Sequence, residues 1–381
     1  MSGTATYRGR DPATGRGREI RVENGLIGSI SPCSDEGPWL AAGLVDLQVN
    51  GFGGLDLNAG ALDAATVSAL CRRLAQEGVT RFLPTLVTAP EAALLARLAA
   101  IAGVMRSDPL AARMIAGVHV EGPFISALDG PRGAHPLADV RAADADEIAR
   151  WQEAADGLVR VVTLAAESPG AGAAIRAART MGITVALGHS AASPDQIRAA
   201  VDAGATMSTH LGNGIAAMLP RHPNPIWTQL ADDRLTASFI CDGHHLPYDT
   251  AKAMFRAKGQ GRAVLVSDAV ALAGMPPGRY EAAVGGAVDV GADGRISLAG
   301  TSLLAGAGHA LRVMVARAAN HAGVSLARAL AMASDDAAAA AGLAPCLEPG
   351  ARADLIRFDF TPGDDTLRLR DVIIAGERVA P

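Results

Sequence analysis

The chain has 381 residues, of which 49% are hydrophobic and 19% are charged, and its formal net charge is −5. A chain of this size can bury one large core, with room for a small second domain. The weak acidic balance excludes the broad basic face of a nucleic-acid-binding protein. The longest apolar runs are interrupted by Arg, Asp or Gly and fall short of the roughly 20 residues that span a bilayer. We therefore expect a small-molecule partner and no membrane or nucleic-acid partner.

The four cysteines are Cys33, Cys71, Cys241 and Cys346, and no two of them form a CxxC pair. This spacing predicts neither a disulfide framework nor a cysteine-based zinc site. The N-terminal residues are polar and lack the apolar stretch of a signal peptide. Together these features favour a cytoplasmic protein.

The two ends of the chain have similar composition and both contain short segments of alternating apolar and polar residues. Residues 1–42 are rich in Gly, Arg and Asp and include the alternating segment 19–22, with a turn at 23–25. Residues 346–381 include two similar segments, 353–358 and 370–374, with a turn at 374–376. Alternation of this kind is typical of antiparallel strands with polar turns. The sequence predicts that residues 1–42 and 346–381 pair into one small β-sandwich domain.

Between these ends, residues 43–345 alternate short apolar runs with longer alanine-rich stretches that fit helices. Continuously apolar runs are typical of parallel strands buried on both faces. Eight such units in order predict an α/β fold, a (β/α)8 TIM barrel, with an open doubly wound sheet as the alternative. No glycine-rich phosphate loop follows the first run, which weighs against that alternative. The eight predicted strands are 43–47, 81–85, 114–120, 159–164, 183–187, 206–209, 236–240 and 263–266.

Polar and titratable residues stand at the ends of nearly all these predicted strands. In a barrel of this kind, chemistry gathers at the carboxyl ends of the strands. Polar and titratable groups are thus expected at one end of the barrel. They are Asp46, Gln48, Asn50, His119, Glu121, His189, His210, Asp242 and Asp268.

Glu121, His189 and His210 are the predicted metal ligands. Two imidazoles and one carboxylate form a common catalytic zinc set that leaves one position open for water. The competing interpretation is that His189 and His210 are ordinary loop histidines bonded to the backbone. Because they end successive predicted strands and Glu121 ends a third, the metal interpretation is favoured.

Asp268 ends the eighth predicted strand and is the predicted catalytic residue. A carboxylate there can take a proton from an attacking water and pass it to a departing amine. The alternative is an N-cap for the next segment, a role that Asp also fills well. The neighbouring histidine pair favours catalysis.

At this point the sequence resembles the amidohydrolase superfamily and, within it, the N-acetylglucosamine-6-phosphate deacetylases. The resemblance covers most of the chain, and its motifs occur in the order of that family. They are 43–51, 119–124 (HVEGPF), 132–135 (RGAH), 188–190 (GHS), 209–213 (THLGN), 242–245 (DGHH), 266–269 (VSDA), 300–303 (GTSL) and 350–355.

The resemblance implies one divalent metal ion per subunit on Glu121, His189 and His210, with Asp268 as acid and base. Zinc suits this ligand set, although Fe2+, Mn2+ or Co2+ could occupy it. Many superfamily members carry His-x-His after the first strand and bind a second metal there. This chain has Gln48 and Asn50 instead, so a single-metal site is expected. Substrate contacts are implied at His135, Asn213, Gly214, His245 and Leu303.

The chain departs from the family around the sixth strand. Gly212 stands where the family usually has an aromatic residue, and residues 218–225 differ from the usual sequence of the family. Family members place a phosphate-binding arginine in this loop, often reaching the neighbouring subunit. Arg221 has a compatible offset, which implies a phosphate contact and a homodimer.

The sequence predicts a metal-dependent deacetylase that hydrolyses N-acetylglucosamine-6-phosphate to glucosamine-6-phosphate and acetate. Three alternatives stay open. One is an amidohydrolase for another N-acyl compound, such as an N-acyl-D-amino acid, an unphosphorylated amino sugar or a cyclic amide. The others are a non-catalytic metal- or sugar-binding barrel and, least favoured, a phosphotriesterase-like hydrolase.

Overall fold

Eight parallel strands form the centre of the fold, which a computed structural model describes for residues 3–34, 37–283 and 285–380. Their order in the sheet follows their order in the chain, from β5 to β14. They are β5 (Leu44–Val49), β8 (Val79–Val87), β9 (Val118–Glu121), β10 (Val159–Leu164), β11 (Thr184–Leu187), β12 (Met207–Ser208), β13 (Thr236–Phe239) and β14 (Ala263–Leu265).

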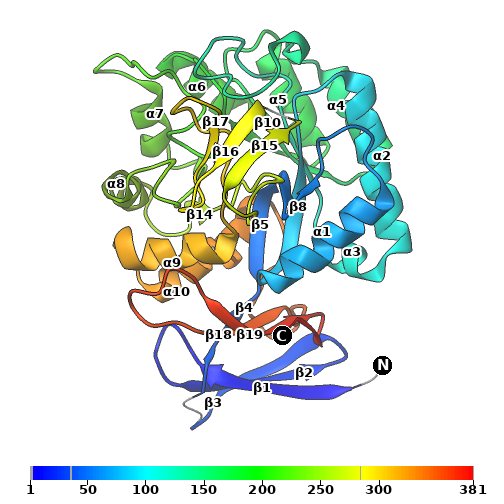
Figure 1. The fold of residues 1–381 in the computed structure, drawn as a ribbon, viewed down its shortest axis with the longest axis vertical. Coiled ribbons are helices and arrows are strands. Elements are labelled where there is room, and N and C mark those ends of the chain that lie inside the picture. Colours follow the sequence, from blue (N-terminus) through cyan, green and yellow to red (C-terminus); the bar gives the residue numbers. More distant parts are fainter. Residues whose placement is uncertain (1–2, 35–36, 284, 381) are drawn as a thin grey trace.

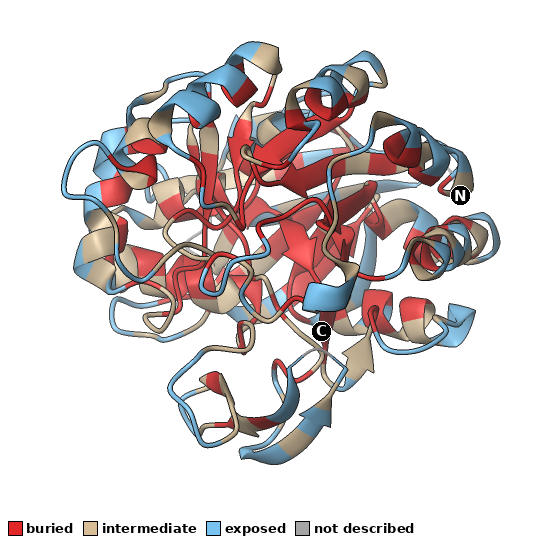
Figure 2. Ribbon diagram, turned by 90° about the horizontal axis from the view of Figure 1, so that it is seen from above, coloured by how far each residue is buried: buried red, intermediate tan, exposed pale blue. Residues whose placement is uncertain are grey.

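Helices surround this sheet, and Figure 2 shows buried strands at the centre with helices whose outer faces are exposed. This arrangement confirms the predicted TIM barrel. None of the helices in the described part of the chain is long and apolar enough to cross a membrane. The helices are α1 (Ala64–Gln76), α2 (Glu91–Ser107), α3 (Pro109–Met114), α4 (Ala145–Ala154), α5 (Ala171–Thr180), α6 (Pro194–Ala203), α7 (Pro225–Ala231), α8 (Tyr248–Lys258), α9 (Leu311–His321), α10 (Leu326–Met332) and α11 (Asp335–Ala340), with a 3-10 turn at Leu137–Asp139.

Local sequence signals explain where several helices begin. The Ser193 side chain accepts from the backbone N–H of Gln196, and the Gln196 side chain accepts from that of Ser193, so α6 starts with a complete capping box. At α3, Asp108 caps the helix and Pro109 occupies its first turn. The strand predicted over 114–120 therefore begins too early, because Met114 still belongs to α3 and β9 starts only at Val118.

The barrel closes between its first and last strands through single contacts in place of a regular ladder. A parallel bridge joins Val49 to Ala269, and the backbone N–H of Asn50 donates to the Ala269 carbonyl at 2.8 Å. The Asp46 carboxylate accepts from the Ser267 backbone N–H at 3.1 Å. These contacts fix the position of Asp268, which lies between Ser267 and Ala269.

Both chain ends form one separate seven-stranded sheet below the barrel (Figure 1). The half made of β1, β2 and β3 lies under the half made of β4, β18, β19 and β20, and a small apolar core includes residues of both halves. The predicted turns are present, with positive φ at Asn24 and Ala375. The strands are β1 (Thr4–Arg10), β2 (Gly17–Glu23), β3 (Leu26–Pro32), β4 (Trp39–Ala42), β18 (Leu355–Asp359), β19 (Arg368–Ile374) and β20 (Glu377–Ala380).

The predicted boundaries of this β domain, after residue 42 and before residue 346, stay a prediction. Residues 1–2, 35–36 and 381 of the predicted domain lie outside the described residues.

A three-stranded antiparallel sheet follows β14 and was not predicted from the sequence. It consists of β15 (Gly278–Ala282), β16 (Gly286–Val290) and β17 (Ile296–Leu298), and it lies across the barrel in Figure 1. Its small core contains Val288, Val290 and Ile296, which pack with Leu272 from the segment after β14. A two-stranded hairpin of β6 (Gly51–Phe52) and β7 (Leu55–Asp56) follows β5. Both additions lie next to the carboxyl ends of barrel strands.

Candidate active site

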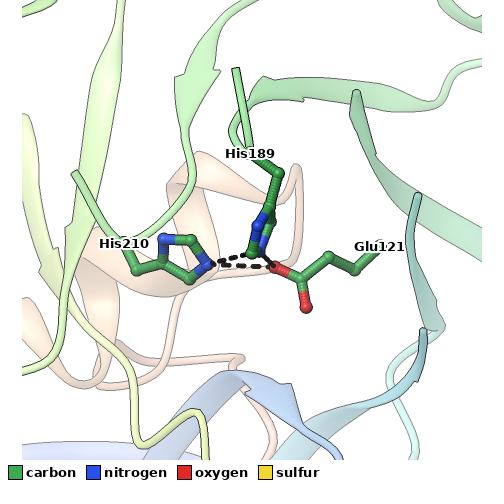
Figure 3. Close-up of side chains that lie close together, drawn as sticks. All are labelled: Glu121, His189 and His210. Carbon is green, nitrogen blue, oxygen red and sulfur yellow. Dashed lines mark hydrogen bonds and ion pairs between the residues drawn. The ribbon is translucent and has the colours of Figure 1, made fainter. Parts of the chain in front are cut away.

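Glu121, His189 and His210 converge on one point at the carboxyl ends of β9, β11 and β12 (Figure 3). The Nε2 atom of His210 lies 3.1 Å from Glu121 Oε1 and 3.1 Å from His189 Nε2. His189 Nε2 lies 3.3 Å from the same Glu121 oxygen. All three residues are buried. The structure therefore brings the three predicted ligands together.

The donor set fits a divalent metal. Three ligand atoms, two imidazole nitrogens and one carboxylate oxygen, lie within 4.8 Å of one another, and this is the one such group among the described residues. Two histidines and a glutamate are a standard ligand set of catalytic zinc. Burial raises the pKa of Glu121, but hydrogen bonds from His189 and His210 outweigh it and hold this pKa well below the ordinary value. Glu121 is therefore a carboxylate, as a ligand must be.

Gln48 lies at the end of β5 and Asn50 directly follows that strand, both beside carboxylates of the site. The Gln48 amide donates to Glu121 Oε1 at 2.9 Å, and the Asn50 amide donates to Asp268 Oδ1 at 2.8 Å. Both side chains thus orient carboxylates of the site.

Asp268 is partly buried on the segment after β14, in the same cavity as the three ligands. Burial and the nearby Glu121 carboxylate raise the pKa of Asp268 to about 6. A carboxyl group with a pKa near the working pH can both accept and donate a proton. Its φ of 49° is rare for a non-glycine residue, and His189 (49°) and His210 (29°) share this left-handed conformation. Such outliers gather at functional sites, where surrounding contacts hold them.

Two further polar residues at strand ends, His119 and Asp242, are held by buried hydrogen bonds. His119, one of the polar residues singled out at the strand ends, donates from Nδ1 to the Leu47 carbonyl and accepts at Nε2 from Thr163 Oγ1. Asp242 accepts the Nδ1 proton of His245 at 2.7 Å and the backbone N–H groups of His244 and His245. Burial raises the pKa of Asp242, but its bonds to His245 outweigh burial and lower it to about 2. Asp242 therefore positions His245.

The site opens into a cavity of about 730 Å³. Its walls include the predicted substrate residues His135, Asn213, Gly214, His245 and Leu303. The cavity also receives Ala282, Val288 and Leu298 from the three-stranded sheet, which makes that side apolar. The volume lies in the usual range for a small-molecule site.

His135 lies in the cavity wall beside the predicted metal ligand His189. Its Nδ1 lies 2.8 Å from Thr88 Oγ1, and its ring centroid lies 4.4 Å from that of His189. Burial and the neighbouring His189 lower the pKa of His135 to about 3. The ring is therefore neutral at physiological pH and can offer an N–H donor without carrying charge.

Two arginines occupy different places. Arg221 is exposed in the loop after β12 and is not among the described residues that line the cavity. Arg132 is the one Lys or Arg among those lining residues; it donates to the His135 carbonyl at 2.9 Å and contacts Asp129. Arg132 belongs to a motif that the sequence singled out, yet no role was predicted for it. Only the packing of its loop shows that it reaches the cavity.

Comparisons with known proteins show the family of this chain. The Amidohydrolase family profile matches residues 39–379. N-acetylglucosamine-6-phosphate deacetylase of Bos taurus is 38% identical over 89% of this chain and 83% of its own length. N-acetylgalactosamine-6-phosphate deacetylase of Escherichia coli O157:H7 is 35% identical over 90% of both chains.

Solved structures give the same result. N-acetyl-D-glucosamine-6-phosphate deacetylase of Mycobacterium smegmatis superposes with a TM-score of 0.89 at 31% identity, over 98% of this chain and 99% of that one. A variant of that enzyme was solved with N-acetyl-D-glucosamine-6-phosphate and gives a TM-score of 0.86 at 33% identity, over 96% of this chain and 95% of that one. The chain therefore belongs to the amidohydrolase family and, within it, to the N-acetylglucosamine-6-phosphate deacetylase family.

Proposed function

We propose that this protein removes the acetyl group from an N-acetylhexosamine 6-phosphate, first of all N-acetylglucosamine-6-phosphate, giving glucosamine-6-phosphate and acetate. The observation that carries the proposal is the buried group of Glu121, His189 and His210 in one cavity with Asp268. A site that only binds metal or sugar has no need of the proton carrier. The relatives named for this reaction support the substrate class.

Glu121, His189 and His210 would hold one divalent ion per subunit, with zinc the best match to the ligand set. A bound ion of this kind makes water nucleophilic near neutral pH and polarises an acyl carbonyl. Gln48 and Asn50 already donate to carboxylates of the site, and amide side chains in this arrangement do not offer a second metal its usual imidazole ligands.

Asp268 would move the proton. Its carboxylate, oriented by Asn50, takes a proton from the attacking water and delivers it to the nitrogen of the breaking amide bond. An amine leaves readily only when it is protonated. His135 would donate its N–H to the acyl oxygen, where negative charge develops.

The remaining substrate contacts would come from four other residues that line the cavity. His245, held by Asp242, and Asn213 offer polar atoms. Gly214 lies in the wall against the His189 ring, and Leu303 contributes an apolar edge. The four cysteines carry free thiols, which accords with the cytoplasmic location we propose.

Arg132 and Arg221 are the two candidates for the contact with the substrate phosphate. Arg132 lies in the cavity of its own chain, whereas Arg221 would have to act on the cavity of a second subunit. The second arrangement requires at least a homodimer. Replacing each arginine by alanine separates them, because loss of the phosphate contact raises KM for the phosphorylated sugar and leaves KM for its unphosphorylated parent unchanged.

The test is acetate release by the zinc-loaded chain from four compounds. They are N-acetylglucosamine-6-phosphate, N-acetylgalactosamine-6-phosphate, N-acetylglucosamine and an N-acetyl-D-amino acid. We expect turnover of one or both phosphosugars at a kcat/KM far above that of the other two compounds. Turnover of only the amino acid derivative, or of none of the four, would contradict the proposal. N-acetylgalactosamine-6-phosphate is included because one relative is named as a deacetylase of that compound.

A further inference from the structure

The loop that carries Arg132 and His135 into the cavity also holds a metal ligand in place. We infer that the segment from Ser126 to His135, here the Ser126–His135 loop, is a positioning element for His189, so that loading of the metal and ordering of this loop depend on each other. The inference rests on the metal site proposed above. It assigns to Pro131 the role of positioning residue for His189.

The loop fixes both the ring and the backbone of His189. The Pro131 carbonyl accepts the Nδ1 proton of His189 at 2.8 Å. In the metal-loaded protein this bond would define the tautomer, because the proton stays on Nδ1 and Nε2, which hydrogen-bonds Glu121 in the metal-free chain, is left with the lone pair that a metal needs. The backbone N–H of Ser126 donates to the His189 carbonyl at 2.9 Å. One end of the loop thus holds the main chain of the ligand, and its middle holds the side chain.

The loop also packs against the His189 ring. The His135 ring meets it at a centroid distance of 4.4 Å and an angle of 63°. Gly133 has φ of 59°, and a Cβ at that position would lie 3.5 Å from His189 Cε1. The loop therefore covers one side of the His189 ring, and a displaced loop would remove the acceptor of its Nδ1 proton.

The other histidine ligand is held differently. His210 Nδ1 has no hydrogen-bond partner among the described residues, and its backbone N–H donates to Ser238 Oγ on β13 at 2.8 Å. The contacts that orient His210 thus come from the barrel. The dependence on the Ser126–His135 loop is specific to one ligand.

The same loop presents Arg132 and His135 to the cavity. A metal that binds His189 in its oriented form stabilises the docked loop, and a docked loop strengthens metal binding by the same factor. The substrate wall formed by this loop would therefore be complete only in the metal-loaded protein.

The first test measures metal affinity in a proline variant and a matched control. Pro131→Gly removes the ring that restricts the backbone carrying the acceptor carbonyl. Pro169→Gly makes the same change at a proline whose carbonyl accepts from the Ala143 backbone N–H at 2.9 Å, away from the ligands. Competition with a chromophoric chelator gives the Zn2+ affinity, and Co2+ substitution gives a visible spectrum that reports ligand geometry. We expect Pro131→Gly to lose about 10- to 100-fold in affinity with an altered Co2+ spectrum, and Pro169→Gly to match the wild type.

The second test needs no variant. Hydrogen exchange of the wild-type chain is compared with Zn2+ bound and after removal of metal by a chelator, without substrate. We expect amides of residues 126–135, including Ser126, to exchange markedly faster in the metal-free protein, with β5 and β10 unchanged.

Equal Zn2+ affinity of Pro131→Gly and wild type, or equal exchange of residues 126–135 with and without Zn2+, would overturn the inference while leaving the deacetylase proposal intact. A wild-type chain that binds neither Zn2+ nor Co2+ would overturn both.

Discussion

Asp268 combines a place in the cavity, a positive φ and a hydrogen bond from Asn50. Its replacement by asparagine keeps the shape of the side chain and removes the proton carrier. We expect Asp268→Asn to lower kcat by a factor of about 10²–10⁴, while the bound zinc measured by atomic emission stays at the wild-type level. Asp195→Asn, an exposed acid on α6, is the control and should retain full turnover. Loss of zinc together with activity would assign Asp268 a role in metal binding instead.

Asp242 gives a prediction on pH. Its pKa falls from the ordinary 3.8 to about 2 in the folded chain. A depressed acid pKa means that the native protein gains stability above the unfolded value and loses it as the pH falls from about 4 toward 2. The shift corresponds to about 2 kcal/mol at neutral pH. The melting temperature of Asp242→Asn should lie below that of the wild type at pH 7, and the gap should narrow by pH 3. A gap that is the same at both pH values would contradict this prediction.

At the residue scale, the sequence was sufficient to propose the groups that end barrel strands. Glu121, His189 and His210 could be selected because the fold itself carries strand ends to one face. The contacts around them could not be predicted in the same way. Gln48 meets Glu121, and the Pro131 carbonyl meets His189, through side-chain and loop geometry that leaves no periodic signal in the sequence.

Gly43 joins the strand β4 of the terminal sheet to the barrel strand β5. A Cβ at this position would lie 2.2 Å from Thr80 Oγ1 on β8, and the Gly43 N–H donates to the Asp354 carbonyl at 2.9 Å. We expect Gly43→Ala to destabilise the protein by about 1–3 kcal/mol through overpacking. Thermal unfolding followed by circular dichroism measures this, with Gly3→Ala as control, since a Cβ there has no neighbour within 4 Å. Equal melting temperatures for both variants would contradict the prediction, because they would show that Thr80 on β8 moves aside without a loss of stability.

At the element scale, the eight barrel strands were predictable because buried parallel strands are continuously apolar. The three-stranded sheet was missed for the opposite reason. Its strands are short, rich in glycine and largely exposed, with only a few buried positions such as Val288 and Val290. A sequence of that kind resembles a loop, yet this sheet supplies an apolar side of the cavity.

The whole molecule raises the question of how many chains form one active site. If Arg221 reaches the cavity of a partner, then Asp268→Asn and Arg221→Ala damage different parts of a shared site. Mixing the two low-activity variants under conditions that exchange subunits should restore activity, because a mixed dimer has one site with both residues intact. Light scattering should find a dimer. Absence of recovery in a confirmed mixed dimer would assign the phosphate to a residue of the same chain, with Arg132 the candidate.

At this scale the sequence predicted the barrel and the separate unit formed by the chain ends. It could not establish the oligomeric state, because Arg221 stands on an exposed loop whose role depends on what lies opposite.

The most direct test is acetate release from N-acetylglucosamine-6-phosphate by chelator-stripped protein, before and after titration with Zn2+. We predict no turnover in the stripped protein and full turnover at one equivalent of Zn2+ per chain. Turnover that persists without metal, or a chain that takes up one equivalent of Zn2+ and still releases no acetate, would contradict the account.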